Sequence, residues 1–149
     1  MRLALRWIPF VVALGAGTAS AAAAQPDNRY TRLVRDQLTR AAAVFVDRGF
    51  RVADQPVLDR LGPEETATHE VTLTGGREYV LVGVCDEDCQ DVDLRLLDAD
   101  GDVLAEDVAA DDTPILMVRA PRTGSYRLQV VMARCSASVC WYGVQLYRR

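Results

Sequence analysis

From residue 64 to its end, the sequence is a succession of short strand-like runs with turn residues between them. Residues 69–74 alternate polar and apolar side chains, and residues 79–84 form an unbroken apolar run, typical of a strand buried on both faces. Similar runs follow at residues 92–97, 102–106, 115–119, 126–132 and 141–147. No helical pattern separates them, which excludes parallel β-α-β units. The sequence predicts an all-β sandwich of the jelly-roll or immunoglobulin-like type, with seven to eight strands.

Glycine and proline mark the boundaries of these runs. Gly101 follows Asp100 between two of the runs, which predicts a hairpin whose glycine adopts a left-handed conformation. Pro56, Gly62 and Pro63 interrupt the chain before the first run, so we expect residues 50–63 to be a connector.

One amphipathic helix is predicted ahead of the sandwich. Residues 30–48 carry a 3.6-residue period, and Gly49 suits a helix C-terminal cap. Asp27 and Asn28 are the candidate N-caps. The apolar stripe consists of Val34, Leu38, Ala41, Ala42 and Phe45. This stripe should cover one face or one open end of the sheets, which gives a helix and connector at residues 25–63 and a sandwich at residues 64–149.

Residues 1–24 have the pattern of a secretory signal peptide. Arg2 and Arg6 precede a short apolar core, and small residues follow as far as Ala24. The apolar run is shorter than the roughly 20 residues that span a bilayer, which disfavours the alternative of a retained anchor. We expect cleavage near Ala24 or after Ala21, export to the periplasm or the medium, and no stable membrane anchor afterwards.

The four cysteines predict disulfides, because an even count is typical of exported chains. Spacing favours the local pairs Cys85–Cys89 and Cys135–Cys140, since residues 136–139 form a short connection between two strand-like runs. Cross-pairing between the two loops would close longer loops and stabilise more, so it stays open as the alternative. The C-x3-C spacing and its acidic neighbours, which disfavour a thiolate, argue against a redox site.

Charge is unevenly distributed along the chain. Residues 86–112 hold 12 acidic residues and one arginine, whereas residues 113–149 hold six arginines and no acid. This asymmetry is explained either by acidic and basic strands lying side by side, or by a negative patch that collects a cation. The candidate calcium ligands are Asp86, Asp88, Asp91 and Asp93, because calcium takes about six to eight oxygen ligands. The alternative is a solvated, charged strand end that discourages edge-to-edge pairing.

The composition argues against several function classes. Residues 25–149 carry 15 arginines and 21 acidic residues, a net charge of −6, which argues against nucleic acid as a partner. The single histidine, His69, heads a strand-like run, and every serine after residue 25 lies at a turn, so no catalytic triad is evident. Zinc would also lack ligands. We expect no enzyme, with a carboxylate pair for glycoside hydrolysis as the enzymatic alternative.

Four runs resemble the bacterial pre-peptidase C-terminal (PPC) domain: EVTLTGGREYVLVG, DVDLRLLDADGDVLAED, TGSYRLQVV and YGVQLY. The resemblance spans residues 70–147 and rests on Asp91, Asp93, Leu94, Leu96, Asp98, Gly101, Gly124 and Tyr126. It implies a secreted, non-catalytic jelly-roll module, often appended to hydrolases, with acidic loops that bind calcium in some members. The chain departs from that pattern by containing no protease domain and by adding a helix and four cysteines.

The sequence therefore predicts a small exported, disulfide-stapled β-sandwich that acts as a non-catalytic binding or interaction module of the cell envelope or secreted fraction. Its expected partner is a protein or an envelope polysaccharide. The alternative is a calcium-dependent carbohydrate-binding or enzyme-accessory module. The candidates for an aromatic ligand face are Tyr126, Trp141, Tyr142 and Tyr147. Strand alternation places about half of them in the core, and core packing is the favoured role for most.

Overall fold

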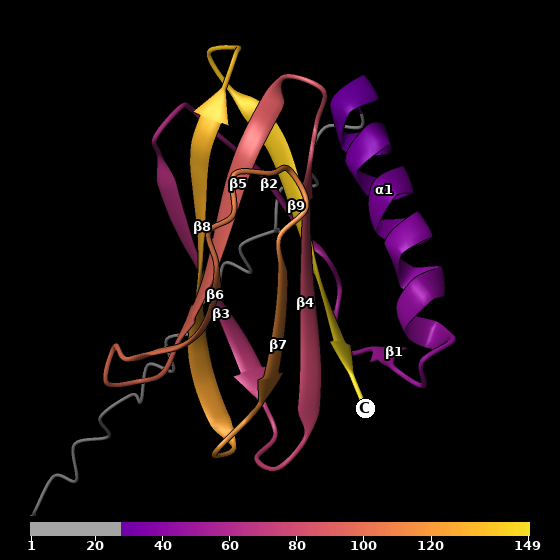
Figure 1. Cartoon of the computed structure of the whole chain (residues 1–149), viewed down its shortest axis with the longest axis vertical. Helices are drawn as coiled ribbons and strands as arrows, with labels where there is room; N and C mark the ends of the chain where they lie inside the picture. The colour runs from indigo at the N-terminus through magenta and orange to yellow at the C-terminus, as the bar shows by residue number, and fades with distance from the viewer. Residues whose placement is uncertain (1–27) are drawn as a thin grey trace, which may run out of the picture.

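The computed structural model describes residues 28–149, so the predicted signal peptide lies outside the described residues. In the described part, one helix, α1 (Arg29–Val46), precedes nine strands in two antiparallel sheets (Figure 1). The strands are β1 (Arg51–Val52), β2 (Val57–Leu61), β3 (Thr66–Leu73), β4 (Glu78–Cys85), β5 (Cys89–Leu97), β6 (Val103–Asp107), β7 (Ile115–Arg119), β8 (Gly124–Cys135) and β9 (Cys140–Arg148). This is the predicted all-β sandwich with one preceding helix.

The strands β2 to β9 have jelly-roll topology. Sheet A contains β9 and β4 at its centre, with β7 on one edge and both β1 and β2 on the other. Sheet B has the order β3-β8-β5-β6. The pairing is nested, because β2 pairs with β9, β3 with β8, β4 with β7, and β5 with β6. A long antiparallel hairpin rolled up into two packed sheets produces this nesting.

Two of the strands lie where the sequence predicted a connector. Pro56 and Gly62 do bound β2, but the five residues between them pair with β9. Only Leu61 is buried in this strand, so the sequence lacks the alternation of apolar residues that would indicate a strand here. Pairing with a long neighbour therefore makes β2 a strand, and the described strands number nine rather than seven or eight.

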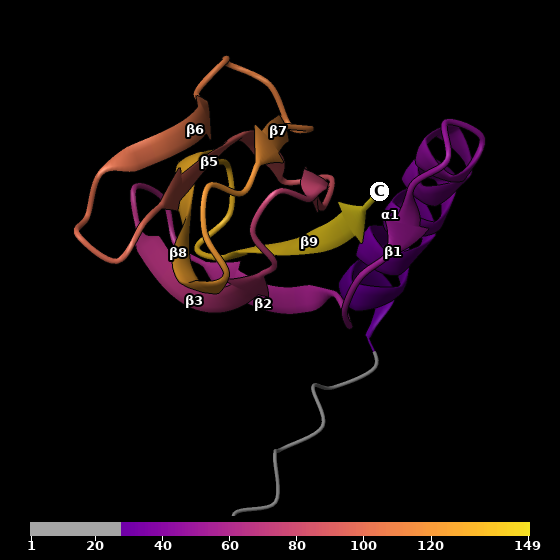
Figure 2. The same cartoon turned by 90° about the horizontal axis from the view of Figure 1, so that it is seen from below.

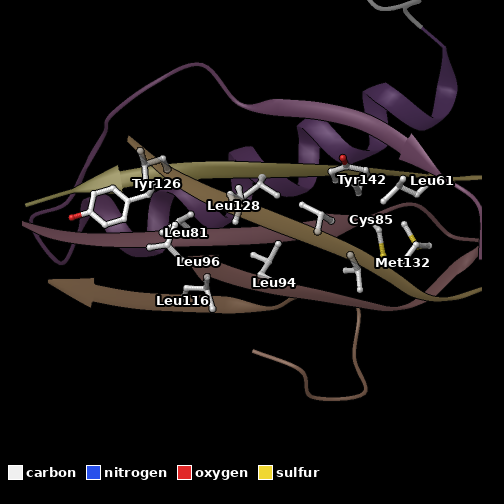
Figure 3. Packing of buried hydrophobic residues seen from close by; sticks show 14 of the residues in the cluster. Leu61, Leu81, Cys85, Leu94, Leu96, Leu116, Tyr126, Leu128, Met132 and Tyr142 are labelled. Carbon is white, nitrogen blue, oxygen red and sulfur yellow. The ribbon is translucent and has the colours of Figure 1, made fainter. Parts of the chain in front are cut away.

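The main core lies between the two sheets (Figure 3). Leu81 and Leu116 enter it from sheet A, and Leu94 and Leu128 enter it from sheet B; all four are at most 1% exposed. Tyr126 lies towards one end of this layer. Full burial of a leucine stabilises a fold by about 1.5–3 kcal/mol, so these side chains hold the sheets together.

The other face of sheet A is covered by α1, which forms a second core (Figures 1 and 2). β4 lies between the two cores: Leu81 packs between the sheets, whereas Val80 and Val82 pack under the helix. Burial on both faces explains the unbroken apolar run at residues 79–84 and confirms that prediction. The molecule thus has three layers, in the order α1, sheet A, sheet B.

The ends of α1 are formed by the residues that the sequence indicated. Asn28 is the N-cap, because its side chain accepts hydrogen bonds from the backbone N–H groups of Tyr30 and Thr31. The Thr31 hydroxyl accepts one from the Asn28 backbone, which completes a capping box. Gly49 has a φ of 85° just beyond the helix, a conformation that favours glycine.

Gly143 in β9 allows α1 to approach sheet A closely. A Cβ atom at this position would lie 2.6 Å from Val34 Cγ1, 2.9 Å from Leu58 Cδ2 and 3.0 Å from Leu38 Cδ1. Val34 and Leu38 belong to the apolar stripe of the helix. The helix therefore packs directly on the backbone of β9.

We predict that Gly143→Ala destabilises the protein by about 1–3 kcal/mol, because the added methyl group overpacks the interface with α1. The measurement is urea-induced unfolding of the oxidised protein. Gly124→Ala is the matched control, since no atom lies within 4 Å of its Cβ position and its φ is not positive. Equal effects of the two substitutions would contradict this account of helix docking.

Candidate functional site

Both predicted local disulfides are present, Cys85–Cys89 and Cys135–Cys140. The first joins the end of β4 in sheet A to the start of β5 in sheet B, and the second joins the end of β8 in sheet B to the start of β9 in sheet A. Cys89 and Cys135 stand opposite each other in neighbouring strands. The two bonds therefore brace the same end of the sandwich.

Asp86, the first candidate calcium ligand, links the two stapled loops. It is 2% exposed, and its carboxylate accepts hydrogen bonds from the backbone N–H of Trp141 at 2.7 Å and of Asp88 at 3.2 Å. The Asp86 N–H donates in return to the Trp141 carbonyl at 2.9 Å. Burial raises the pKa of Asp86, and these backbone hydrogen bonds oppose that shift. Both carboxylate oxygens thus have partners within the protein.

Asp91 and Asp93 lie apart from that loop, in β5. Val92 and Leu94 point into the core, which places the two aspartates on the outer face of sheet B. Asp91 Oδ2 is 3.7 Å from Arg134 Nη2 on the neighbouring strand. Burial raises the pKa of Asp93, and the nearby Asp91 carboxylate adds to that shift.

The four aspartates therefore do not form one site. Within residues 28–149, no group of three or more histidine, cysteine, aspartate or glutamate side chains is placed to hold a metal ion. The aspartates occupy two separate places. Asp86 holds the two disulfide loops together by its hydrogen bond with Trp141, whereas Asp91 and Asp93 lie on sheet B, where Arg134 partly compensates their charge.

We predict that millimolar calcium leaves the melting temperature of the oxidised protein unchanged. A bound cation at 100 times its Kd would stabilise the fold by about 2.7 kcal/mol, which a thermal melt detects readily. Asp93→Asn should not destabilise the protein, because burial and the Asp91 carboxylate disfavour the ionised form of Asp93. A calcium-dependent rise in melting temperature that Asp93→Asn abolishes would restore the calcium prediction.

The aromatic candidates belong to the packed interior, and the half-buried His69 contacts one of them. Tyr126, Tyr142 and Tyr147 are at most 3% exposed, and Trp141 is 8% exposed. The Nε2 atom of His69 lies 2.8 Å from the Tyr142 hydroxyl. The four aromatic residues therefore fill the two cores, the role that was favoured for most of them, and do not form an aromatic ligand face.

Stability should depend on the protonation of His69. Burial lowers its pKa, and the Asp59 carboxylate opposes that shift more weakly. Between the ordinary value of about 6.5 and the lowered folded value, the unfolded state binds the proton more tightly, so stability falls as the pH drops. We predict that the free energy of unfolding decreases below pH 6.5, by at most about 1.4 kcal/mol per pH unit from this group.

His69→Gln tests this prediction, because glutamine retains a polar partner for Tyr142 but does not titrate. Urea unfolding between pH 7.5 and pH 5.5 should show a slope in the native protein that the variant lacks. An identical slope in both proteins would assign the pH dependence to other groups.

The opposite end of the sandwich carries a cluster of arginines. A cavity of about 310 Å³ is lined by Gly49, Arg51, Arg77, Arg148 and Arg149. We call it the arginine cleft. Its residues come from the α1–β1 connection, from β1, from the β3–β4 turn and from the end of β9. Three segments distant in sequence therefore meet at this end.

Like charges are brought together in the arginine cleft. Arg51 in β1 stands directly opposite Arg148 in β9. Like charges at such cross-strand positions destabilise a sheet. Among the described residues, neither these two arginines nor Arg77 has a carboxylate within ion-pair distance. The cleft therefore holds three uncompensated positive charges.

Arg149 differs from the other arginines of the cleft because Phe50 and Glu78 hold its side chain in place. Its guanidinium lies 4.8 Å from the centre of the Phe50 ring, and its Nε donates to Glu78 Oε2 at 3.0 Å. Its backbone N–H donates to the Glu78 carbonyl at 2.9 Å. Hydrogen bonding to Arg149 lowers the pKa of Glu78, so this carboxylate stays ionised and partly balances the cluster.

Elsewhere, acidic and basic residues from different parts of the sequence lie next to each other in the structure. Arg122 lies 3.9 Å from the Asp98 carboxylate and 3.8 Å from the Asp100 carboxylate, and Arg134 faces Asp91. These contacts support the explanation by neighbouring segments of opposite charge. Arg148 and Arg149 of the basic segment lie in the arginine cleft, and no motif in the sequence indicated that they meet Arg51 and Arg77 there.

No protein-family model and no curated protein sequence matches this chain. The resemblance to the PPC domain thus rests on its sequence motifs alone. Within the described residues, no helix has the length and apolar character needed to cross a membrane. The two disulfides and this finding are compatible with an exported protein.

Proposed function

We propose that this chain is an exported, non-catalytic binding module that captures an anionic ligand in the arginine cleft. The observation that supports this function is the placement of four arginines around one cavity, three of them without a carboxylate partner among the described residues. The buried Asp86 and the half-buried His69, by contrast, have hydrogen-bond partners inside the protein.

An anion is the ligand that this cleft fits best. The guanidinium is planar, permanently charged and able to donate two parallel hydrogen bonds to a carboxylate, phosphate or sulfate. A bound anion would also relieve the repulsion between Arg51 and Arg148, which stand opposite each other. The folded protein thus bears an electrostatic cost that ligand binding removes.

Binding, rather than turnover, suits the residues that line the cleft. Arginine stays protonated at neutral pH and so serves neither as a general base nor as a nucleophile. The PPC-like motifs fit a secreted module of this kind. We place the module in the periplasm or the medium, with an envelope component as its partner.

We predict that inorganic pyrophosphate binds to the protein and that binding weakens as ionic strength rises. The double variant Arg51→Gln/Arg148→Gln should lose about tenfold or more in affinity, because hydrogen bonds to charged groups contribute about 1.5–3 kcal/mol each. Isothermal titration calorimetry measures the affinity.

The control is Arg127→Gln/Arg134→Gln, which removes the same two positive charges from exposed positions of β8 outside the cleft and should leave the affinity unchanged. A second signature is the stability of the free protein. Removing one of two opposed arginines should stabilise the fold by about 0.2–1 kcal/mol while it weakens binding. Absence of pyrophosphate binding, or equal losses in the control, would contradict the proposed function.

A further inference from the structure

The structure points to an anionic amphiphile as the ligand of the arginine cleft, with a single alkyl chain lying in an adjoining apolar cavity. This inference rests on the proposed function and specifies its ligand class. We infer that the anionic group occupies the arginine cleft, while the chain passes Arg149 and lies against Met117 of β7.

A second cavity adjoins the arginine cleft. It measures about 220 Å³ and is lined by Phe50, Glu78, Tyr79, Met117, Val118, Arg119 and Arg149. Arg149 lines both cavities, so its side chain lies between them. One cavity is lined almost entirely by arginines, whereas the apolar surface of the other is mainly that of Met117 and the half-buried Val118. A ligand that fills both needs a charged group and an apolar part.

Met117 supplies the exposed apolar surface of the second cavity. It stands opposite Val80, which is fully buried under α1, but Met117 itself is 68% exposed. The helix packs on β9 and β4, so the outer face of β7 extends beyond the surface that it covers (Figure 1). An unbranched methionine adapts its shape to varied apolar partners, which suits a flexible alkyl chain.

The charges at the junction do not oppose an anionic ligand. Glu78 is the one acidic residue in the two linings, and it forms ion pairs with both Arg149 and Arg119. Its negative charge is therefore balanced before any ligand binds. The Arg149 guanidinium lies against the Phe50 ring, at the junction of the arginine cleft and the apolar cavity. In the part of the chain that the structure describes, no isolated carboxylate lies at this junction.

A single amphiphile fits this surface better than a polysaccharide or a bilayer. Phe50 and Tyr79, the aromatic residues of the lining, are at most 4% exposed and offer no open ring for a sugar to stack on. The apolar surface lies in a cavity, and the neighbouring exposed Val52 lines neither of the two cavities. The observations therefore favour one chain entering a cavity.

The experiment compares alkyl phosphates of two chain lengths by isothermal titration calorimetry, below the concentrations at which they form micelles. Octyl phosphate should bind more tightly than ethyl phosphate, by about fourfold for each methylene that becomes buried. Octyl glucoside, with the same chain and a neutral head, should not bind measurably. Met117→Thr should remove much of the gain from the longer chain and leave ethyl phosphate binding unchanged.

Ile115→Thr is the matched control, because Ile115 lies on the same face of the same strand but outside both linings. Equal affinities for ethyl and octyl phosphate would overturn the amphiphile and leave the proposed anion-binding function intact. Failure of both alkyl phosphates to bind while pyrophosphate binds would overturn the amphiphile alone, and failure of all three to bind would overturn both proposals. Binding to vesicles containing phosphatidylglycerol without binding to monomeric octyl phosphate would replace the amphiphile with a membrane surface.

Discussion

Burial of sheet A on both faces is the constraint on which the rest of this structure depends. β4 and β9 each carry apolar side chains on alternate faces, one set packed against sheet B and the other against α1. Backbone hydrogen bonding within the sheet satisfies the polar groups of these strands, so both faces can be apolar. Gly143 lets the helix lie directly on β9. The helix is therefore part of the fold and not an appendage to a finished sandwich.

This three-layer arrangement gives the two ends of the sandwich different characters. At one end, two disulfides and the hydrogen bonds of Asp86 close the crossings between the sheets. At the other end, the chain leaves α1, forms the short β1 and pairs with the last residues of β9. Each small disulfide loop contributes only about 2 kcal/mol through chain entropy. The disulfides therefore fix the positions of the crossings between the sheets as much as they stabilise the fold. The end without disulfides is the one that carries the uncompensated charge.

Local patterns predicted the fold well, because the period of apolar residues reports directly on burial. The stripe containing Val34 and Leu38 and the unbroken run of β4 both correspond to buried faces. β2 was not predicted because it becomes a strand by pairing with β9, 79 to 87 residues further along the chain, and its own sequence pattern does not indicate a strand. The calcium prediction was based on carboxylate density. That density does not show whether each oxygen is already hydrogen-bonded, as those of Asp86 are.

The arginine cleft could not have been predicted from the sequence for a related reason. Arg51, Arg77 and Arg148 are unremarkable where they stand, and only the jelly-roll path brings their segments to one end. Repulsion between the opposed Arg51 and Arg148 is a cost that the fold alone does not require. A glutamine at either position would remove it. Under the proposed function, an anion bound between Arg51 and Arg148 would offset this repulsion, and Arg149, which lines both cavities, would lie beside both the charged and the apolar part of the ligand.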